Sequence, residues 1–260
     1  MDRITIIRTE AQRFADVLGA VTPDARCPTC PDWTASDLLW HLTEVHHFWA
    51  GVLSRDARTD VDIEAIEQAK PEHPIAMSDL LALREQATAA LLAQLDRLDD
   101  AEPRWSWWQP DQTVGFTRRM QTYEATMHRV DAEQTAGLPI GPIAPAVAAG
   151  AVDHAVDVMW GWLPNWATYE TRAVVEFVAR DFEQQWLVEV GHWTGTAPES
   201  GTQFDQPRAV RATTGEPTAT IRAPVIDLAL WAWTRGGSVE TSGQAASLAA
   251  LDALITNGMQ

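Results

Sequence analysis

The spacing of apolar residues changes character well past the midpoint of the chain. Up to about residue 163, apolar residues recur every three to four positions, which is the period of an amphipathic helix. Beyond that point, short apolar stretches separated by turn residues indicate a mixture of strands and helices. We therefore expect a two-domain α+β protein, with a helical bundle over residues 1–165 and a smaller α+β domain over residues 166–260.

The first part should contain five helices and two long connections. The connection from Ser54 to Met77 is polar and carries two prolines, and a tryptophan-rich loop covers residues 102–115. Long connections in compact domains are often functional. The predicted helices cover residues 4–21, 37–53, 78–98, 116–137 and 144–163, with Thr34 or Ser36 as the cap of the second and Ser78 as the cap of the third.

Four shorter signals define the second part. Residues 184–193 read as a strand, and residues 208–223 read as two short strands around a Gly-Glu-Pro turn. Helices are expected over residues 224–237, which begin with proline and end with glycine, and over residues 244–255.

The charge of the chain limits its partners. Its formal net charge is -17, so binding to nucleic acid or to an anionic membrane surface is not expected. The first residues lack a long apolar run, no stretch has the length of a membrane span, and the chain has 2 cysteines. We expect a cytoplasmic protein that acts on small molecules, as a monomer or a homodimer.

A polar stripe follows one side of the helix predicted at residues 116–137. Thr117, Gln121, Glu124, His128 and Asp131 share it, beside the apolar face of that helix. A stripe at the edge of the core is typical of a solvated flank, but also of the wall of an internal cleft. Because glutamate and histidine are zinc ligands, the pair four residues apart is a candidate metal site.

A catalytic zinc usually takes three protein ligands and keeps one position open. The candidates for the third are His41, His46 and His47 in the helix predicted at residues 37–53. His41 and His46 flank its apolar stripe on opposite sides, whereas His47 points away from the stripe. Periodicity alone does not choose between His41 and His46.

Other chemistry-bearing residues give weaker signals. Asp153, His154 and Asp157 share a helix, which indicates either an alternative site or an ordinary surface. Cys27 and Cys30 have metal-ligand spacing, but one such pair does not complete a cysteine-rich zinc site. The chain has no glycine-rich phosphate loop, no Gly-x-Ser-x-Gly elbow and no His-Glu-x-x-His pair.

Two further features suggest ligand binding. Trp105 and Trp108 belong to the tryptophan-rich loop, where they could wall a ligand pocket instead of packing in a core. Arg235 lies at the end of a predicted helix, where a cation is favoured by the helix dipole. It is either a capping residue or an anion clamp.

The stretch CPDWTASDLLWHLTEVHHFW, followed by RRMQTYEATMHRVDAE, resembles the mycothiol-dependent maleylpyruvate isomerase family of actinobacteria. The later segment ATIRAPVIDLALWAWTRGG resembles the family's C-terminal region more weakly. The resemblance implies a DinB-like four-helix bundle followed by a small α+β domain. Two positions depart from the family pattern: Tyr123 stands where many members have histidine, and residues 238–243 replace a Gly-Asp turn.

The resemblance also implies roles for individual residues. A divalent metal, with zinc expected, would be held by His41, Glu124 and His128. Asp131 would orient a metal ligand or a neighbouring arginine. Arg235 matches an arginine that the family's isomerase uses with its substrate, so it would hold a substrate carboxylate.

The implied reaction uses mycothiol as cosubstrate. Metal coordination deprotonates a thiol, and the thiolate then attacks a small electrophile, for which a carboxylate is one candidate class. The outcome would be isomerisation or S-transfer. Two alternatives remain: a hydrolase or lyase of the same fold that activates water without a thiol, and a non-catalytic DinB-like protein that binds a metal or ligand.

Overall fold

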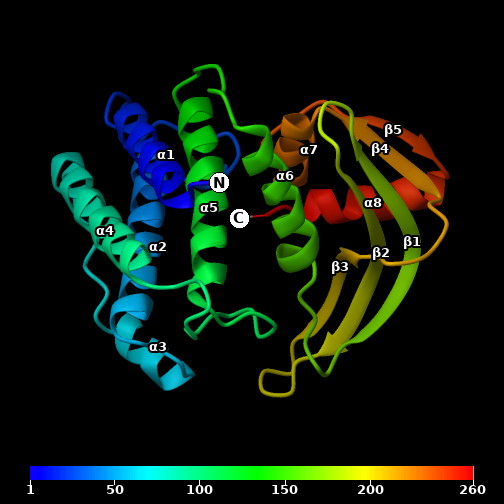
Figure 1. Ribbon diagram of the computed structural model, residues 1–260, viewed down its shortest axis with the longest axis horizontal. Helices are drawn as coiled ribbons and strands as arrows, with labels where there is room; N and C mark the ends of the chain where they lie inside the picture. Colours follow the sequence, from blue (N-terminus) through cyan, green and yellow to red (C-terminus); the bar gives the residue numbers. More distant parts are fainter. Residues whose placement is uncertain (260) are drawn as a thin grey trace. The chain divides into compact units, whose positions relative to one another are not determined.

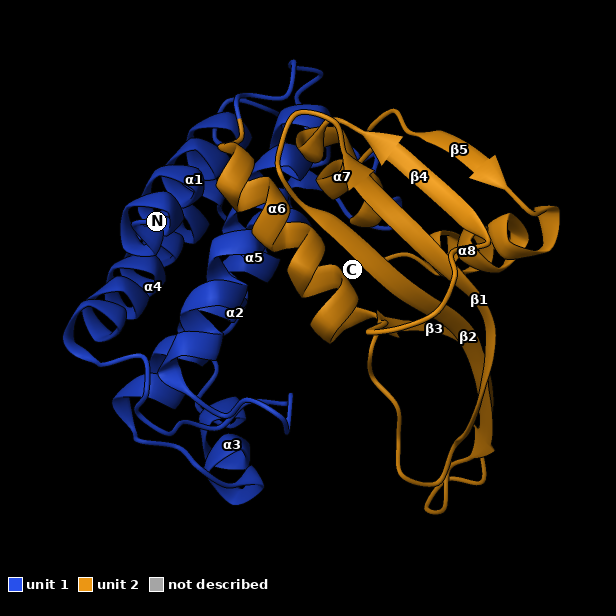
Figure 2. Cartoon of the chain, turned by 45° about the vertical axis from the view of Figure 1, so that its right-hand side comes forward, with its two compact units in different colours: residues 1–142 blue, residues 143–260 orange. Residues whose placement is uncertain are grey.

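The computed structural model describes residues 1–259, and the chain forms two compact units (Figure 2). Unit 1 is residues 1–142 and unit 2 is residues 143–260. Unit 1 is helical and unit 2 combines helices with a sheet (Figure 1), which confirms the expected α+β class with a helical bundle first.

Unit 1 is a bundle of four long helices, and one short helix, α3, lies in the chain between α2 and α4. α2 packs mainly against α4, and α1 packs mainly against α5. The elements are α1 (Arg3–Leu18), α2 (Ala35–Ser54), α3 (Asp60–Glu67), α4 (Met77–Arg97) and α5 (Val114–Thr135).

Side-chain caps determine where several of these helices begin. Of the two caps expected for α2, the structure uses Thr34, whose hydroxyl accepts from the backbone N–H of Asp37 while the Asp37 carboxylate accepts from Thr34. Thr113 caps α5 in the same way with its hydroxyl. Ser78 does not cap α4, which begins one residue earlier, after Ala76, without a side-chain cap.

The polar connection after α2 contains a helix that periodicity did not predict. α3 has 8 residues and buries only Ile66, so its apolar signal is too small to detect. A capping box between Thr59 and Asp62 stabilises its first turn. The connection predicted between residues 54 and 77 therefore contains one short helix that the sequence analysis did not identify.

Unit 2 is built on a five-stranded mixed sheet with the order β3-β2-β1-β4-β5. β1 pairs with β4 in parallel, and the other neighbours are antiparallel. The elements are α6 (Pro145–His154), the π-helical turn η1 (Ala155–Met159), β1 (Thr168–Ala179), β2 (Gln185–Thr196), β3 (Gln203–Arg211), β4 (Ala219–Ala223), α7 (Val225–Ala232), β5 (Glu240–Gly243) and α8 (Ala245–Asn257).

The core of unit 2 lies on one face of this sheet. Val175 and Phe177 of β1 are fully buried, whereas the alternating residues Val174, Glu176 and Val178 are partly exposed. The Phe177 ring meets Trp231 of α7 and Trp160, both edge to face. Helices therefore cover this face, and aromatic rings fill the layer between them.

α6 belongs to unit 2, so the contact boundary at 142/143 differs from the expected boundary at 165/166. α6 packs against α7, and the indole N–H of Trp233 donates to the carbonyl of Ala151. Arg211 of β3 binds the carboxylates of Asp153 and Asp157. α6 is part of unit 2 because of these long-range contacts, which the spacing of apolar residues does not reveal.

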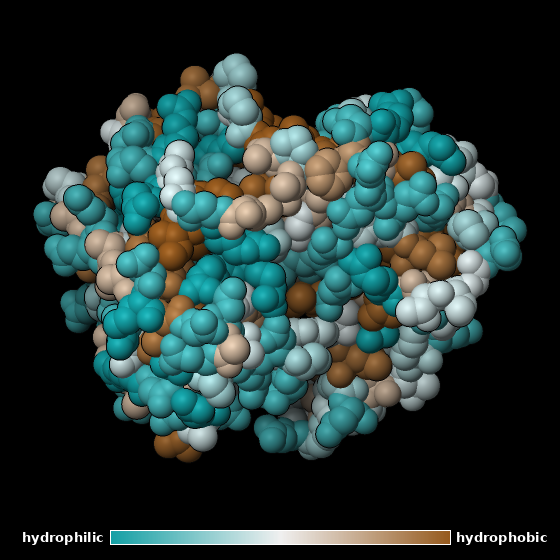
Figure 3. All heavy atoms as spheres, viewed as in Figure 1, coloured by the Kyte–Doolittle hydropathy of each residue, from teal (hydrophilic) through white to brown (hydrophobic). Residues whose placement is uncertain are grey.

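The surface agrees with the acidic, polar composition of the chain. On the face shown in Figure 3, hydrophilic residues predominate and hydrophobic ones are scattered among them. Within residues 1–259, no helix combines the length and the apolar character needed to cross a membrane.

Candidate metal centre

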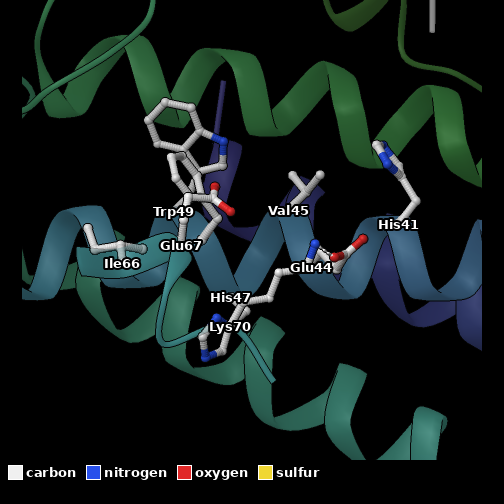
Figure 4. Close-up of a pocket in the computed structure, with 9 residues that line it drawn as sticks. His41, Glu44, Val45, His47, Trp49, Ile66, Glu67 and Lys70 are labelled. Atoms are coloured by element: carbon white, nitrogen blue, oxygen red, sulfur yellow. Dashed lines mark ion pairs between the residues drawn. The ribbon is translucent and has the colours of Figure 1, made fainter. Parts of the chain in front are cut away.

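Three side chains of unit 1 converge on one point. One ligand atom each from His41, Glu124 and His128 lies within 4.8 Å of the others, and within the described residues no other group of three metal-ligating side chains does so. His41 comes from α2, and its ring points toward α5 (Figure 4). Glu124 and His128 come from α5, one turn apart.

The distances within this cluster fit a metal ion. Nε2 of His128 lies 3.2 Å from a carboxylate oxygen of Glu124. The ring centroids of His41 and His128 are 4.8 Å apart, with the rings edge to face. Ligand bonds of about 2.1 Å in a tetrahedron separate neighbouring ligand atoms by about 3.4 Å. The three residues are therefore placed to share a zinc-sized cation after small side-chain rotations.

Asp131 fixes the orientation of His128. Its carboxylate lies 2.9 Å from Nδ1 of His128 and also accepts a hydrogen bond of 2.5 Å from the hydroxyl of Thr29. Asp131 is fully buried. Of the two roles implied by the resemblance, the structure places Asp131 against a predicted metal ligand, and a carboxylate behind a ligand histidine is a common arrangement in metal sites.

The cluster favours positive charge. Burial lowers the pKa of His128, but hydrogen bonds to Asp131 and Glu124 outweigh burial and raise that pKa to about 9. Two carboxylates thus stabilise a cation at the imidazole, which is buried. The same two carboxylates would stabilise a divalent ion, for which the proton on Nε2 must leave.

His46, the alternative that periodicity left open, has a different environment. It is fully buried, its Nδ1 lies 2.8 Å from the hydroxyl of Thr88, and its Nε2 has no hydrogen-bond partner among the described residues. Burial, followed by the charge of Arg84, lowers the pKa of His46 to about 3. The imidazole is therefore neutral, and it does not belong to the converging cluster.

The Cys27–Cys30 loop positions Thr29. Both thiols are free and buried, and the sulfur of Cys27 lies 3.3 Å from the hydroxyl of Thr29. A hydrogen bond from Cys30 lowers the pKa of Cys27 to about 5, against the opposing effect of burial. The loop thus supports Asp131 through Thr29, a contact between residues 102 positions apart that no local pattern in the sequence reveals.

A pocket of about 210 Å³ begins at His41 and extends along α2 to α3. Trp105 lies behind it: its ring contacts Phe48 and Trp49, which both line the pocket. Trp108 instead packs against Trp107 and does not line this pocket. The binding roles expected for Trp105 and Trp108 stay predictions.

Arg235 lies in unit 2, just after α7. Its side chain is 2% exposed, and one guanidinium nitrogen donates to the carbonyls of Trp233 and Met259. Arg235 therefore binds the end of its own helix and the C-terminal segment. Its proposed contact with a substrate carboxylate stays a prediction.

The helical unit matches a known family. Residues 7–133 match the model of the mycothiol maleylpyruvate isomerase N-terminal domain. No curated protein matches the sequence. The matched segment contains all three converging side chains.

Solved structures extend the likeness to the whole chain. The crystal structure of the mycothiol-dependent maleylpyruvate isomerase is similar with a TM-score of 0.59 at 15% identity, over 95% of this chain and 94% of that one. A histidine-to-alanine mutant of the same enzyme gives a TM-score of 0.60 at 14% identity, with the same coverage. The chain therefore has the fold of these structures in both units, and its helical unit matches the N-terminal domain of the mycothiol maleylpyruvate isomerase family.

Proposed function

We propose that this protein is a metal-dependent enzyme that uses mycothiol to attack a small electrophilic substrate, as an isomerase or an S-transferase. The observation that supports it is the convergence of His41, Glu124 and His128 inside a domain of the mycothiol maleylpyruvate isomerase family. The family supports mycothiol as cosubstrate and isomerisation as the first reaction to test. We further propose zinc as the metal and the cytoplasm as the location.

His41, Glu124 and His128 would hold the ion. A divalent ion bound there would make a thiol ionise at neutral pH and present it as a nucleophile. Because the chain's own Cys27 and Cys30 are buried in the loop that supports Thr29, the reacting thiol must come from the cosubstrate.

Asp131 prepares His128 for this role. Its carboxylate accepts a hydrogen bond from the N–H group at Nδ1, so that Nε2 is the nitrogen that faces Glu124 and the site. Thr29 donates to the same carboxylate and restricts its rotation. The orientation of the ligand is thus determined before any metal binds.

Arg235 is proposed to bind a carboxylate of the electrophile. A guanidinium holds a carboxylate through two parallel hydrogen bonds, which suits an acidic substrate. The carbonyls of Trp233 and Met259 engage one of its nitrogens and restrict its orientation.

Cobalt replacement gives the decisive test. The protein loaded with Co²⁺ and titrated with mycothiol should develop a sulfur-to-cobalt charge-transfer band, and His128→Ala should show neither the metal nor the band. A metal-loaded protein with no band at saturating mycothiol would contradict the proposal and favour a hydrolase or lyase that activates water. Retention of full activity after metal removal would exclude both the thiol-dependent metal enzyme and the metal-dependent hydrolase or lyase.

A further inference from the structure

Cys27 and Cys30 lie in a closed loop that precedes α2. The backbone N–H of Cys30 donates to the carbonyl of Cys27 at 3.3 Å, and the N–H of Cys27 donates to the carbonyl of Trp33 at 3.0 Å. A four-residue turn of this kind brings its first and last Cα atoms within about 7 Å, and disulfides join residues whose Cα atoms are about 4.4–6.8 Å apart. The backbone of this loop is therefore compatible with a disulfide between its two cysteines.

The two cysteine side chains also interact with each other. A hydrogen bond from Cys30 is the largest cause that lowers the pKa of Cys27 to about 5. The hydroxyls of Thr29 and Thr135 lower this pKa further, whereas burial and the charge of Asp131 oppose the shift. Cys27 is therefore a thiolate at neutral pH, and the thiolate is the form of cysteine that oxidants attack.

The position of the pair selects small oxidants. Cys27 and Cys30 are 0% and 2% exposed, so a substrate-sized molecule does not reach either sulfur. Their neighbours along the chain, Pro28, Pro31 and Asp32, are exposed, so the pair lies just beneath the surface of the loop. Hydrogen peroxide is close to water in size and needs only a small opening of this loop to reach the thiolate.

A chain of contacts joins the pair to the predicted metal centre. The sulfur of Cys27 lies 3.3 Å from the hydroxyl of Thr29, and that hydroxyl lies 2.5 Å from the carboxylate of Asp131. The same carboxylate lies 2.9 Å from Nδ1 of His128. A hydroxyl group has one proton to donate, so the thiolate of Cys27 and the carboxylate of Asp131 compete for the proton of Thr29.

We propose that Cys27 and Cys30 form a redox-sensitive modification site, which hydrogen peroxide converts into a disulfide and which thereby changes the metal affinity of the neighbouring centre. The thiolate of Cys27 attacks one oxygen of the peroxide, the O–O bond breaks, and a sulfenic acid forms while hydroxide leaves. The sulfur of Cys30 then attacks the sulfur of Cys27, and the hydroxyl group leaves as water with the proton of Cys30. The pair loses two electrons, and the peroxide is reduced to water and hydroxide.

Oxidation should weaken metal binding. A disulfide is uncharged, so the site loses a negative charge that favours a cation, and Thr29 donates its proton to Asp131 alone. Asp131 then becomes a weaker acceptor for Nδ1 of His128, which makes the imidazole a poorer ligand. Loss of a direct partner of a ligand histidine costs about 10–100-fold, so a change one contact farther away should cost about three- to tenfold in affinity. This effect rests on the proposed function, whereas formation of the disulfide does not.

Peptide mapping tests the modification. Residues 27–55 form one tryptic peptide that contains both cysteines and no methionine, so its mass reports on the thiols. After peroxide treatment of the metal-free protein, this peptide should lose two hydrogen atoms, and a phosphine reductant should restore them. Cys30→Ser, which keeps a hydroxyl donor beside Cys27, should stop at a sulfenic acid that dimedone traps, and Cys27→Ser should leave Cys30 unmodified. Wild-type thiols that stay reduced in excess peroxide would overturn the proposal.

Chelator competition with Zn²⁺ tests the coupling, with circular dichroism to verify folding. The affinity of the wild type should fall about three- to tenfold on oxidation and recover on reduction, whereas Cys27→Ser, treated identically, should not change. Equal affinities of the reduced and the disulfide-bonded protein would overturn the coupling. A protein that forms the disulfide but binds no metal in either state would overturn the proposed function and leave the modification site standing.

Discussion

The two units bury very different amounts of polar material. Of the 17 buried polar or charged residues in the described part of the chain, 14 lie in unit 1 and 3 in unit 2. Unit 2 fills its interior with aromatic and aliphatic side chains around Phe177 and Trp186. Burying a polar group destabilises a fold unless hydrogen bonds compensate, so the helical unit depends on internal hydrogen bonds far more than the sheet unit does.

The buried polar side chains are concentrated on α5. Gln121, His128, Arg129, Asp131 and Glu133 are all at most 3% exposed within four turns of one helix. A helix needed only for packing would bury leucine or alanine at these positions. The difference between the units agrees with the proposed metal site, which lies in the helical unit.

The largest effect is expected for the predicted metal ligands. His128→Ala should reduce bound metal to background and lower activity by about a hundredfold or more, because even outer partners of ligand histidines contribute about 10–100-fold. Metal analysis and a steady-state assay provide the measurements. His47→Ala should retain the metal, whereas a His46→Ala protein without metal would show that the histidine of α2 has been misassigned.

Buried and exposed arginines should differ in their contribution to stability. Arg129 is 2% exposed and pairs with Glu10 and Glu133, so Arg129→Met should destabilise the protein by about 3–5 kcal/mol. Arg211 of unit 2 also binds two carboxylates, but all three side chains are more than a third exposed, so Arg211→Met should cost about 0–1 kcal/mol. Urea unfolding measures both, and equal losses would remove the contrast between the units.

A smaller effect is expected behind the metal site. Asp131→Asn preserves the shape of the side chain but weakens the acceptor for Nδ1 of His128, so metal affinity should fall about 10–100-fold. Competition with a chromophoric chelator measures the affinity, and unfolding curves verify that the fold persists. Unchanged affinity would show that Asp131 serves packing alone.

The smallest effect is a pH dependence from His46. Its pKa in the folded state, about 3, lies below the ordinary value of 6.5, so the unfolded chain takes up the proton first. Its contribution to stability is therefore fully present above pH about 6.5 and declines as the pH falls, by at most about 1.4 kcal/mol per pH unit. Between pH 7.5 and 5.5, the thermal unfolding temperature should fall more steeply with decreasing pH for the wild type than for His46→Asn. Parallel curves would mean that His46 titrates normally.

Periodicity predicted the long helices because each has an extended apolar face. The same approach missed α3, which buries one apolar side chain, and β1, whose first half from Thr168 to Arg172 has no buried residue. The strands β2, β3 and β4 overlap the predicted ones because their apolar residues alternate. Short or half-exposed elements are stabilised mainly by their neighbours, which local spacing does not record.

The candidate site was accessible from the sequence only in part. Glu124 and His128 follow from their spacing on one helix, but the choice of His41 over His46 depended on the family resemblance. Both histidines flank the apolar stripe of α2, and the rotation of that helix within the bundle decides which one faces α5. Thr29 was not predicted, since it reaches Asp131 from a loop distant in sequence.

The helix α5 has a consequence for protein engineering. Within the eight residues from Glu124 to Asp131 it holds a carboxylate, an imidazole and the acceptor that orients the imidazole, all joined by contacts inside one helix. Because this one segment carries two of the three candidate metal ligands, grafting it onto another helical bundle would transfer both ligands together. A recipient scaffold would then need only one histidine on the opposing helix to complete the triad.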